Sequence, residues 1–221
     1  NNLMNILAID TCTEVASVTL YSSGVRTSRV LTNVDKSSGH ILKLCDEVFH
    51  ESGRQLKEID LIAYSKGPGA FTGVRMCIGV VQGLSLSCSI PTIGFSTLEL
   101  LGFRASKILK KEKIAIALDA RMGEVYWAVY DHGAINKMKI CGPEDVDYLG
   151  DDFVGVGTGW AVHYDKLHTA SNVEVTDLTI CPEASELVDL SIHAIESGQN
   201  PTFELPQPIY LRNNVAQKSL K

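Results

Sequence analysis

Two short polar turns, each placed directly after an apolar run, carry the side chains best suited to chemistry. The first run, residues 5–10, ends on Asp10 and is followed by Thr11 and Thr13. A carboxylate can orient a hydrated magnesium ion, and two hydroxyls can meet phosphate oxygens. These three residues are therefore candidate nucleotide-contacting residues. The same side chains also satisfy the backbone amides of their own turn in many proteins, and this structural interpretation stays open.

The second turn copies the first only in part. Residues 113–119 again form an apolar run that ends on an aspartate, Asp119, but Ala120, Arg121 and Met122 follow where hydroxyls would be needed. Half of the expected phosphate clamp is thus absent. We expect the isolated chain to bind ATP weakly or not at all. Binding of ATP or ADP is better expected at an interface to which a partner contributes contacts.

No other residues form a convincing reactive group. The glycine-rich stretch 67–73 lacks the lysine of a phosphate-binding P-loop, and no G-x-S-x-G places a serine for acyl transfer. The histidines form neither H-x-x-x-H nor H-E-x-x-H, and the six cysteines form no C-x-x-C. His163 and His168 lie five residues apart, which is wrong for one helical face, so we expect no metal there. The sequence favours a protein without catalytic residues.

A glycine-rich loop and the apolar helix after it form the most distinctive part of the chain. Residues 59–65 read as a buried strand, and 67–75 read GPGAFTGVR. The glycines permit a tight turn, and Thr72 can cap the following helix. From 74 to 86 this helix is apolar almost all round, so most of it must be covered.

One stripe of this helix differs from the rest: Arg75, Gly79, Gln82, Gly83 and Leu86 recur at helical spacing. Two glycines inside a helix cost roughly 1 kcal/mol each relative to alanine, so a close contact should compensate. One interpretation is packing within the same domain. The other is that the stripe binds a partner protein, with Arg75 and Gln82 making polar contacts at its rim. Both stay open.

The remaining segments predict an α/β protein with two similar lobes, the first more regular. We divide the chain into residues 4–106 and a smaller, degenerate lobe, 107–221, that ends in an extended proline-containing tail. The predicted strands span 5–10, 15–21, 25–31, 59–65, 92–95, 113–119, 124–130 and 152–156. Helices are predicted from Ser37 or Ser38 onward, over 74–86, from the Ser96–Glu99 capping box to 109, over 143–149 and over 183–196, with a loop at 157–160.

Composition and charge restrict the function further. Hydrophobic residues make up 45% and charged residues 21% of 221 residues, and the net charge of −6 argues against a protein that binds nucleic acid alone. The apolar runs fall short of about 20 residues, so no membrane span is expected. We expect no signal peptide, and Met4 as the natural start. Scattered cysteines fit a reducing, cytoplasmic location.

Six segments, in the same order along the chain, resemble the TsaB (YeaZ) family, and the matches run from residue 6 to 216. The longest of these segments are specific rather than generic. The segments are 6–14 (ILAIDTCTE), 67–75 (GPGAFTGVR), 94–98 (GFSTL), 119–127 (DARMGEVYW), 156–160 (VGTGW) and 210–216 (YLRNNVA).

This resemblance implies a ribonuclease-H-like fold of the actin and sugar kinase superfamily. It further implies a cytosolic, non-catalytic partner and activator of TsaD, the transferase that places threonylcarbamoyl on the adenosine next to the tRNA anticodon. TsaE, a small ATPase, would join the complex, and tRNA would be met only through it. The family often has a histidine at the start of the first long helix, where this chain has Ser37, with His40 three residues later.

Two other functions remain as alternatives. One is an enzyme, either a nucleotide-dependent hydrolase using Asp10 and Thr11 or a metal-dependent peptidase-like protein. The other is a homodimer of unrelated purpose that pairs through the same glycine stripe. We also expect the chain to form a homodimer when it is isolated from its partner.

Overall fold

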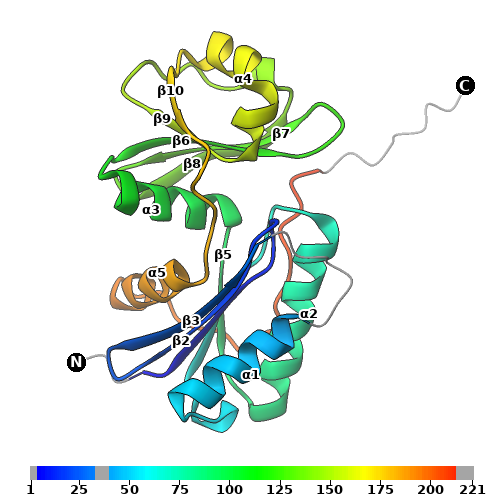
Figure 1. Cartoon of the computed structure of the whole chain (residues 1–221), viewed down its shortest axis with the longest axis vertical. Helices are drawn as coiled ribbons and strands as arrows, with labels where there is room; N and C mark the ends of the chain where they lie inside the picture. The colour runs from blue at the N-terminus through cyan, green and yellow to red at the C-terminus, as the bar shows by residue number, and fades with distance from the viewer. Residues whose placement is uncertain (1–3, 33–39, 213–221) are drawn as a thin grey trace, which may run out of the picture.

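The computed structural model describes residues 4–32 and 40–212. Its two lobes each contain a five-stranded mixed sheet, and helices pack against both faces of each sheet (Figure 1). Ser37 and residues 213–216 of the last family-like segment lie outside the described residues. His40 is the first residue of helix α1.

The first sheet has the strand order β3-β2-β1-β4-β5. Its first three strands form an antiparallel meander, and β4 and β5 run parallel to β1. The strands are β1 (Ile6–Asp10), β2 (Ala16–Ser22), β3 (Val25–Leu31), β4 (Leu61–Ser65) and β5 (Thr92–Phe95).

The second sheet repeats this order, as β8-β7-β6-β9-β10. Again three antiparallel strands are followed by two that run parallel to the first. The strands are β6 (Lys113–Asp119), β7 (Val125–Asp131), β8 (Ala134–Cys141), β9 (Val154–Val156) and β10 (Val175–Asp177). The prediction of two similar lobes is thus confirmed as a duplicated topology.

Helices fill the layers on both sides of these sheets. α1 (His40–Ser52) and α2 (Phe71–Cys88) pack on one face of the first sheet, and α5 (Ser185–Glu196) packs on the other. On the second sheet, α3 (Thr97–Leu109) covers one face and α4 (Thr158–Ser171) the other. α3 and α5 therefore lie next to each other between the two sheets (Figure 1). Two short 3₁₀ helices, η1 (Leu56–Glu58) and η2 (Pro143–Asp145), lie in connections.

The two lobes exchange their last helices. α3 follows directly after β5 of the first sheet, yet it packs on the second sheet; α5 follows β10 of the second sheet, yet it packs on the first. The division predicted between residues 106 and 107 falls within α3, which ends at Leu109. Each lobe is consequently completed by a helix from the other half of the chain.

Several elements differ from the sequence prediction. Residues 157–160 were expected as a loop but contain the start of α4, where Trp160 is 1% exposed and donates from Nε1 to the Ala115 carbonyl at 3.0 Å. A Cβ on Gly155 would lie 2.6 Å from this indole, so the glycine makes room for it. β8 and β10 were not predicted, and the helix expected over 143–149 is limited to η2.

The two predicted helix caps have different outcomes. The Ser96 hydroxyl accepts a hydrogen bond from the Leu98 amide at 3.1 Å, as expected of an N-cap residue. Thr72, in contrast, does not cap α2. This helix begins at Phe71 with Ala70 as the N-cap residue, because the chain already becomes helical directly after the Gly-Pro-Gly turn.

α2 is, among the described residues, the one helix long and apolar enough to cross a membrane by length and composition. In this fold its apolar side contributes to the core of the first lobe, through Val74, Cys77, Ile78 and Val81. The helix is thus covered on that side by protein.

The chain ends in an extended segment, residues 201–212, called the tail below. Thr202 pairs with Thr92 on β5, the edge strand of the first sheet, and the Ile209 amide donates to the Lys66 carbonyl at 2.8 Å. At its end, Arg212 donates to Glu124 at 2.6 Å and to the Ala120 carbonyl at 3.3 Å. The tail therefore connects the two lobes.

Candidate functional site

The first aspartate turn is a closed, internally bonded structure. Asp10 is fully buried; its Oδ1 accepts from the Cys12 amide at 3.0 Å and from the Ser65 hydroxyl. The Thr11 hydroxyl donates to the Gly73 carbonyl at 2.6 Å, and the Thr13 hydroxyl accepts from the Val15 amide at 3.3 Å. All three candidate nucleotide-contacting residues thus lie together, with their side chains bonded within the protein.

The glycine-rich loop and the start of α2 cover this turn. A Cβ on Gly69 would lie 2.1 Å from the Cys12 carbonyl oxygen, and one on Gly73 would lie 2.2 Å from the Thr11 carbonyl oxygen. Both distances are far below a van der Waals contact, so only glycine permits this approach. The GPGAFTG sequence therefore serves to seal the turn.

Burial changes the acidity of Asp10. It raises the pKa of the carboxyl from 3.8 to about 6, against hydrogen bonds from Cys12 and Ser65 that lower it. The Oδ2 atom has no hydrogen-bond partner among the described residues. Keeping this carboxyl ionised inside the isolated chain is thus costly.

The second aspartate turn is more open and gains a hydroxyl from another element. Asp119 Oδ1 accepts from the Arg121 amide at 3.1 Å, and its own amide donates to the Thr158 hydroxyl at 3.0 Å. Thr158 is the first residue of α4. Sequence reasoning missed Thr158 because residues 157–160 read as a glycine-rich loop. The signal that could have located it is its place in a glycine-containing turn directly after an apolar strand, as in the glycine-rich loop before α2.

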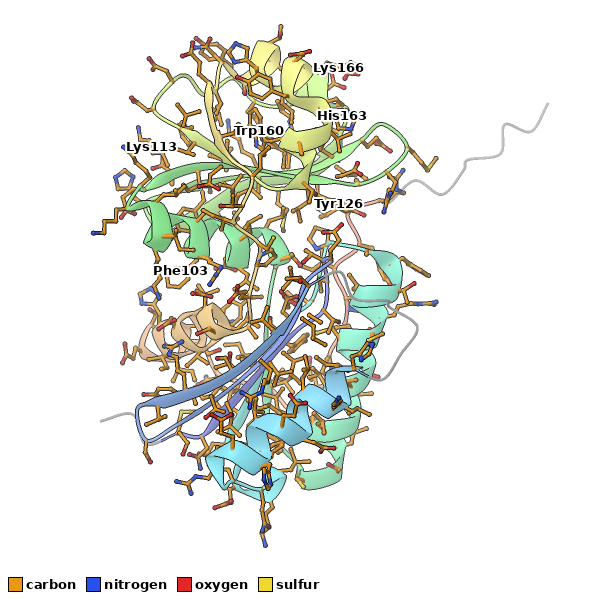
Figure 2. All side chains as sticks on the ribbon, viewed as in Figure 1. Phe103, Lys113, Tyr126, Trp160, His163 and Lys166 are labelled. Carbon is orange, nitrogen blue, oxygen red and sulfur yellow. The ribbon has the colours of Figure 1, made fainter. Side chains whose placement is uncertain are left out.

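His163 also faces this turn. Its Nε2 lies 3.9 Å from Asp119 Oδ1 and is buried without a hydrogen-bond partner among the described residues, at a point where α4 is kinked. His163 and Trp160 project from the same helix (Figure 2). The His168 ring instead stacks on Tyr164 and lies 3.0 Å from the Val173 carbonyl oxygen. The two imidazoles therefore contact different groups.

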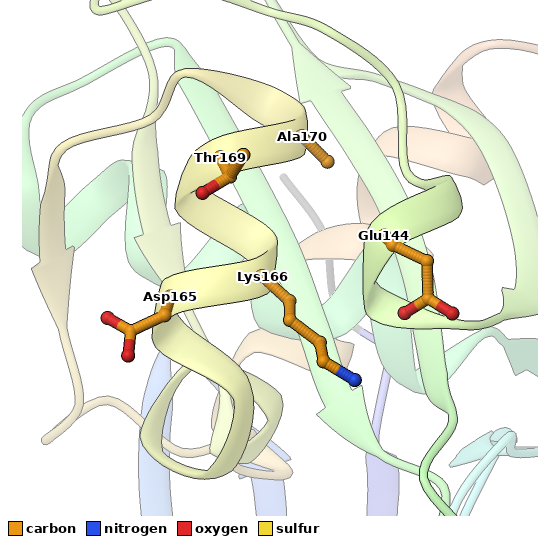
Figure 3. A pocket seen from close by; sticks show the side chains of 5 residues that line it. All are labelled: Glu144, Asp165, Lys166, Thr169 and Ala170. Carbon is orange, nitrogen blue, oxygen red and sulfur yellow. The ribbon is translucent and has the colours of Figure 1, made fainter.

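The described ranges, 4–32 and 40–212, contain no group of three or more His, Cys, Asp or Glu side chains that could hold a metal ion. A surface hollow of about 520 Å³ lies between η2 and α4 (Figure 3). Its charged side chains are mixed in sign, and none of its lining residues belongs to either aspartate turn. The hollow is lined by Glu144, Asp165, Lys166, Thr169 and Ala170.

The glycine stripe of α2 faces outward. Arg75, Gly79 and Gly83 are exposed, and Leu86 is 67% exposed. A Cβ on either glycine would meet no atom of residues 4–32 and 40–212 within 4 Å. Packing against these residues therefore does not account for the two glycines.

Two polar residues of the stripe have partners of their own. The Gln82 side chain donates from Nε2 to the Pro206 carbonyl of the tail at 2.8 Å, so part of its amide already contacts this chain. Arg75 lies over the ring of Phe71, 4.3 Å from its centroid. Phe71, one turn before Arg75, is 61% exposed and extends the stripe by a residue that sequence reasoning did not include.

Comparison with characterised proteins links this arrangement to tRNA modification. The chain is 36% identical to the tRNA threonylcarbamoyladenosine biosynthesis protein TsaB of Escherichia coli K12, over 98% of both chains. It is 31% identical to the TsaB protein of Haemophilus influenzae, over 98% of this chain and 97% of that one. A solved structure described as YeaZ from Pseudomonas aeruginosa is 34% identical and superposes with a TM-score of 0.84, over 94% of this chain and all of that one.

The family model for TsaD, tRNA N6-adenosine threonylcarbamoyltransferase, matches residues 33–219. The TsaB proteins of Escherichia coli and Haemophilus influenzae are covered over almost their whole length, and the resemblance read from the six segments is confirmed. With its two lobes of actin and ribonuclease-H type, the chain belongs to the TsaB family of proteins of tRNA threonylcarbamoyladenosine biosynthesis.

Proposed function

We propose that this protein is a non-catalytic partner of a TsaD-type transferase and activates it in the cytoplasm. The observation that carries the proposal is the outward-facing stripe of α2, with Gly79 and Gly83 open to solvent. Two glycines let a partner helix approach closely, and this close packing would compensate for their low helix propensity. The transfer of threonylcarbamoyl to the adenosine next to the anticodon would then occur on the partner.

The aspartate turns support the absence of catalysis by this chain. Asp10 and Thr11 are buried and bonded within the protein, so neither is presented to a substrate. ATP or ADP would bind at the interface, where the partner supplies the contacts that the second turn lacks. Hydrolytic activity of the purified chain that a chelator abolishes would contradict this part of the proposal and favour the enzyme alternative.

Further partners follow from the same role. A TsaE-type ATPase would join the complex, and tRNA would be bound through the assembled proteins, since the chain carries a net charge of −6. In the absence of the transferase, the glycine stripe would pair with a second copy of this chain. The size of the isolated protein and of a mixture with the transferase, measured by sedimentation, checks both statements.

A single substitution tests the stripe. Gly83→Leu adds a side chain where the monomer has open space, so the melting temperature should be unchanged or slightly higher, while affinity for the transferase should fall by several kcal/mol. Ala161→Leu adds comparable bulk at an exposed position of α4 and is the control, which should bind normally. Normal binding by Gly83→Leu contradicts the proposal.

A further inference from the structure

The end of the tail touches first the loop that covers the first aspartate turn and then the second aspartate turn. The Ile209 carbonyl oxygen lies 3.3 Å from the place that a Cβ on Gly67 would take, so the tail packs directly on the glycine-rich loop. Farther along, the Arg212 guanidinium donates to Glu124 at 2.6 Å and to the Ala120 carbonyl at 3.3 Å. This end of the tail therefore links the two turns.

The two lobes hold the tail with contacts of different strength. On the first lobe, the backbone of Thr202 pairs with β5, and the Ile209 amide donates to a backbone carbonyl. On the second lobe, Leu211 is only partly buried against the core, and the side chains of the Arg212–Glu124 pair are 35% and 33% exposed. Because an exposed ion pair contributes little to stability, the second-lobe end of the tail is the one more easily released.

The lobes meet a second time through α3 and α5, where Arg104 pairs with Glu186. Figure 1 shows these two helices at the left of the molecule and the red end of the tail at the right. Lobes joined by a single small contact turn about it, as hinged domains do. Contacts on two opposite sides instead hold the lobes at one angle, so the tail restricts a motion that the α3–α5 contact alone would allow.

We infer that the end of the tail is a latch that sets the angle between the lobes, and with it the separation of the two aspartate turns. With Leu211 and Arg212 seated on the second lobe, the lobes are held at one angle. With these two residues released, the lobes turn about the α3–α5 contact, while the backbone bonds of the tail stay on the first lobe. The latch needs no partner protein, so its test is independent of the proposed function.

Distances between two spin labels test the latch. Azide-bearing residues encoded in place of Asp46 on α1 and Asp165 on α4, both exposed, carry the labels and leave every cysteine unmodified. Dilution with unlabelled chain restricts the signal to distances within one molecule. By pulsed electron paramagnetic resonance, the otherwise unmodified chain should give one narrow distance distribution. Leu211→Ala combined with Arg212→Ala should broaden this distribution and shift its mean.

A matched control removes the same two residue types within the first lobe. Arg54→Ala breaks an ion pair whose side chains are 35% and 36% exposed, and Leu56→Ala removes a leucine that is likewise only partly buried against a core. The two changes together should lower the melting temperature about as much as the latch variant does. The distance distribution of the control should stay narrow, because neither residue joins the lobes.

Glu124→Ala reaches the latch from the second lobe and leaves the tail sequence intact. It removes the carboxylate that holds Arg212, so trypsin should cut after Arg212 at least about threefold faster. The distance distribution should broaden here too, which keeps the test decisive if the double variant does not fold. A distribution that stays narrow in the folded latch variants overturns the inference. A broad distribution in the chain with the latch intact also overturns it, since the tail would then not fix the angle.

Discussion

Arg104 on α3 binds Glu186 on α5 through both carboxylate oxygens, each at 3.0 Å, and thereby joins the two lobes. The same guanidinium lies 2.9 Å from Glu183. The side chains of Arg104 and Glu186 are 19% and 11% exposed, so this contact is shielded from water more than the other ion pairs of the surface. It lies where the exchanged helices meet.

Removal of this arginine should destabilise the whole chain. Arg104→Ala leaves two neighbouring carboxylates without their cation, and we expect the free energy of unfolding to fall by about 1–3 kcal/mol. Chemical denaturation measures the change. Arg54→Ala is the control, since it breaks an exposed pair with Glu58 on a single segment and should cost no more than about 0.5 kcal/mol. Equal losses in the two variants would contradict a special role for Arg104.

The buried carboxyl of Asp10 should make stability depend on pH. Burial raises its pKa in the folded chain from 3.8 to about 6, so between these values the folded chain binds more protons than the unfolded chain. The free energy of unfolding should therefore fall as the pH rises from about 4 to 6, by up to about 3 kcal/mol from this group.

Asp10→Asn isolates this contribution, because an asparagine keeps an oxygen for the Cys12 amide and does not titrate. Denaturant titration across this pH range measures the free energy of unfolding of both chains. As the pH rises, the unmodified chain should lose stability relative to Asp10→Asn. A difference that does not change with pH would show that Asp10 is not protonated in the folded chain.

Two glycines of the same helix should respond in opposite ways to the same change. Gly73→Ala places a methyl group 2.2 Å from the Thr11 carbonyl oxygen and should destabilise the chain by roughly 1–3 kcal/mol. Gly79→Ala meets no atom of the described residues within 4 Å and should stabilise the chain by up to roughly 1 kcal/mol. Thermal denaturation of both variants gives the comparison; a stable Gly73→Ala would mean that the seal over the first turn is loose.

ATP should bind weakly to the isolated chain. The Asp10 and Thr11 side chains are committed to internal bonds, and Ala120 and Met122 offer no hydroxyl on the other side. Titration calorimetry of the chain alone, and then of its mixture with the transferase, tests this expectation. A micromolar dissociation constant for the chain alone would refute it.

Local patterns were sufficient for much of the fold and for the position of α2. An apolar run ending in aspartate marked β1 and β6, and the glycine-rich loop marked the start of α2. The outward direction of Gly79 and Gly83 could not be read from the sequence, because a glycine at helical spacing fits a core contact and a partner contact equally well. The open space around a Cβ added at each position shows that both glycines face outward from the described residues.

Contacts distant in sequence explain what was missed. α4 begins with Thr158 and Gly159, which have low helix propensity. It is anchored by Trp160, which packs over Gly155 and donates to the Ala115 carbonyl, 45 residues away. Likewise, no local signal shows that the Gln82 amide is bonded to the tail, 124 residues away. Such contacts exist only once the separate elements have packed together.

The exchanged helices have a consequence during synthesis of the chain. The strands β1 and β4 are complete early, but the face formed by Ile6, Ala8, Leu61 and Ala63 is covered by Leu187 and Val188 of α5. Until α5 leaves the ribosome, the first sheet keeps an apolar face uncovered and available to a chaperone. A nascent chain stalled before residue 185 should therefore be captured by chaperones, while one stalled well after the tail should be released from them.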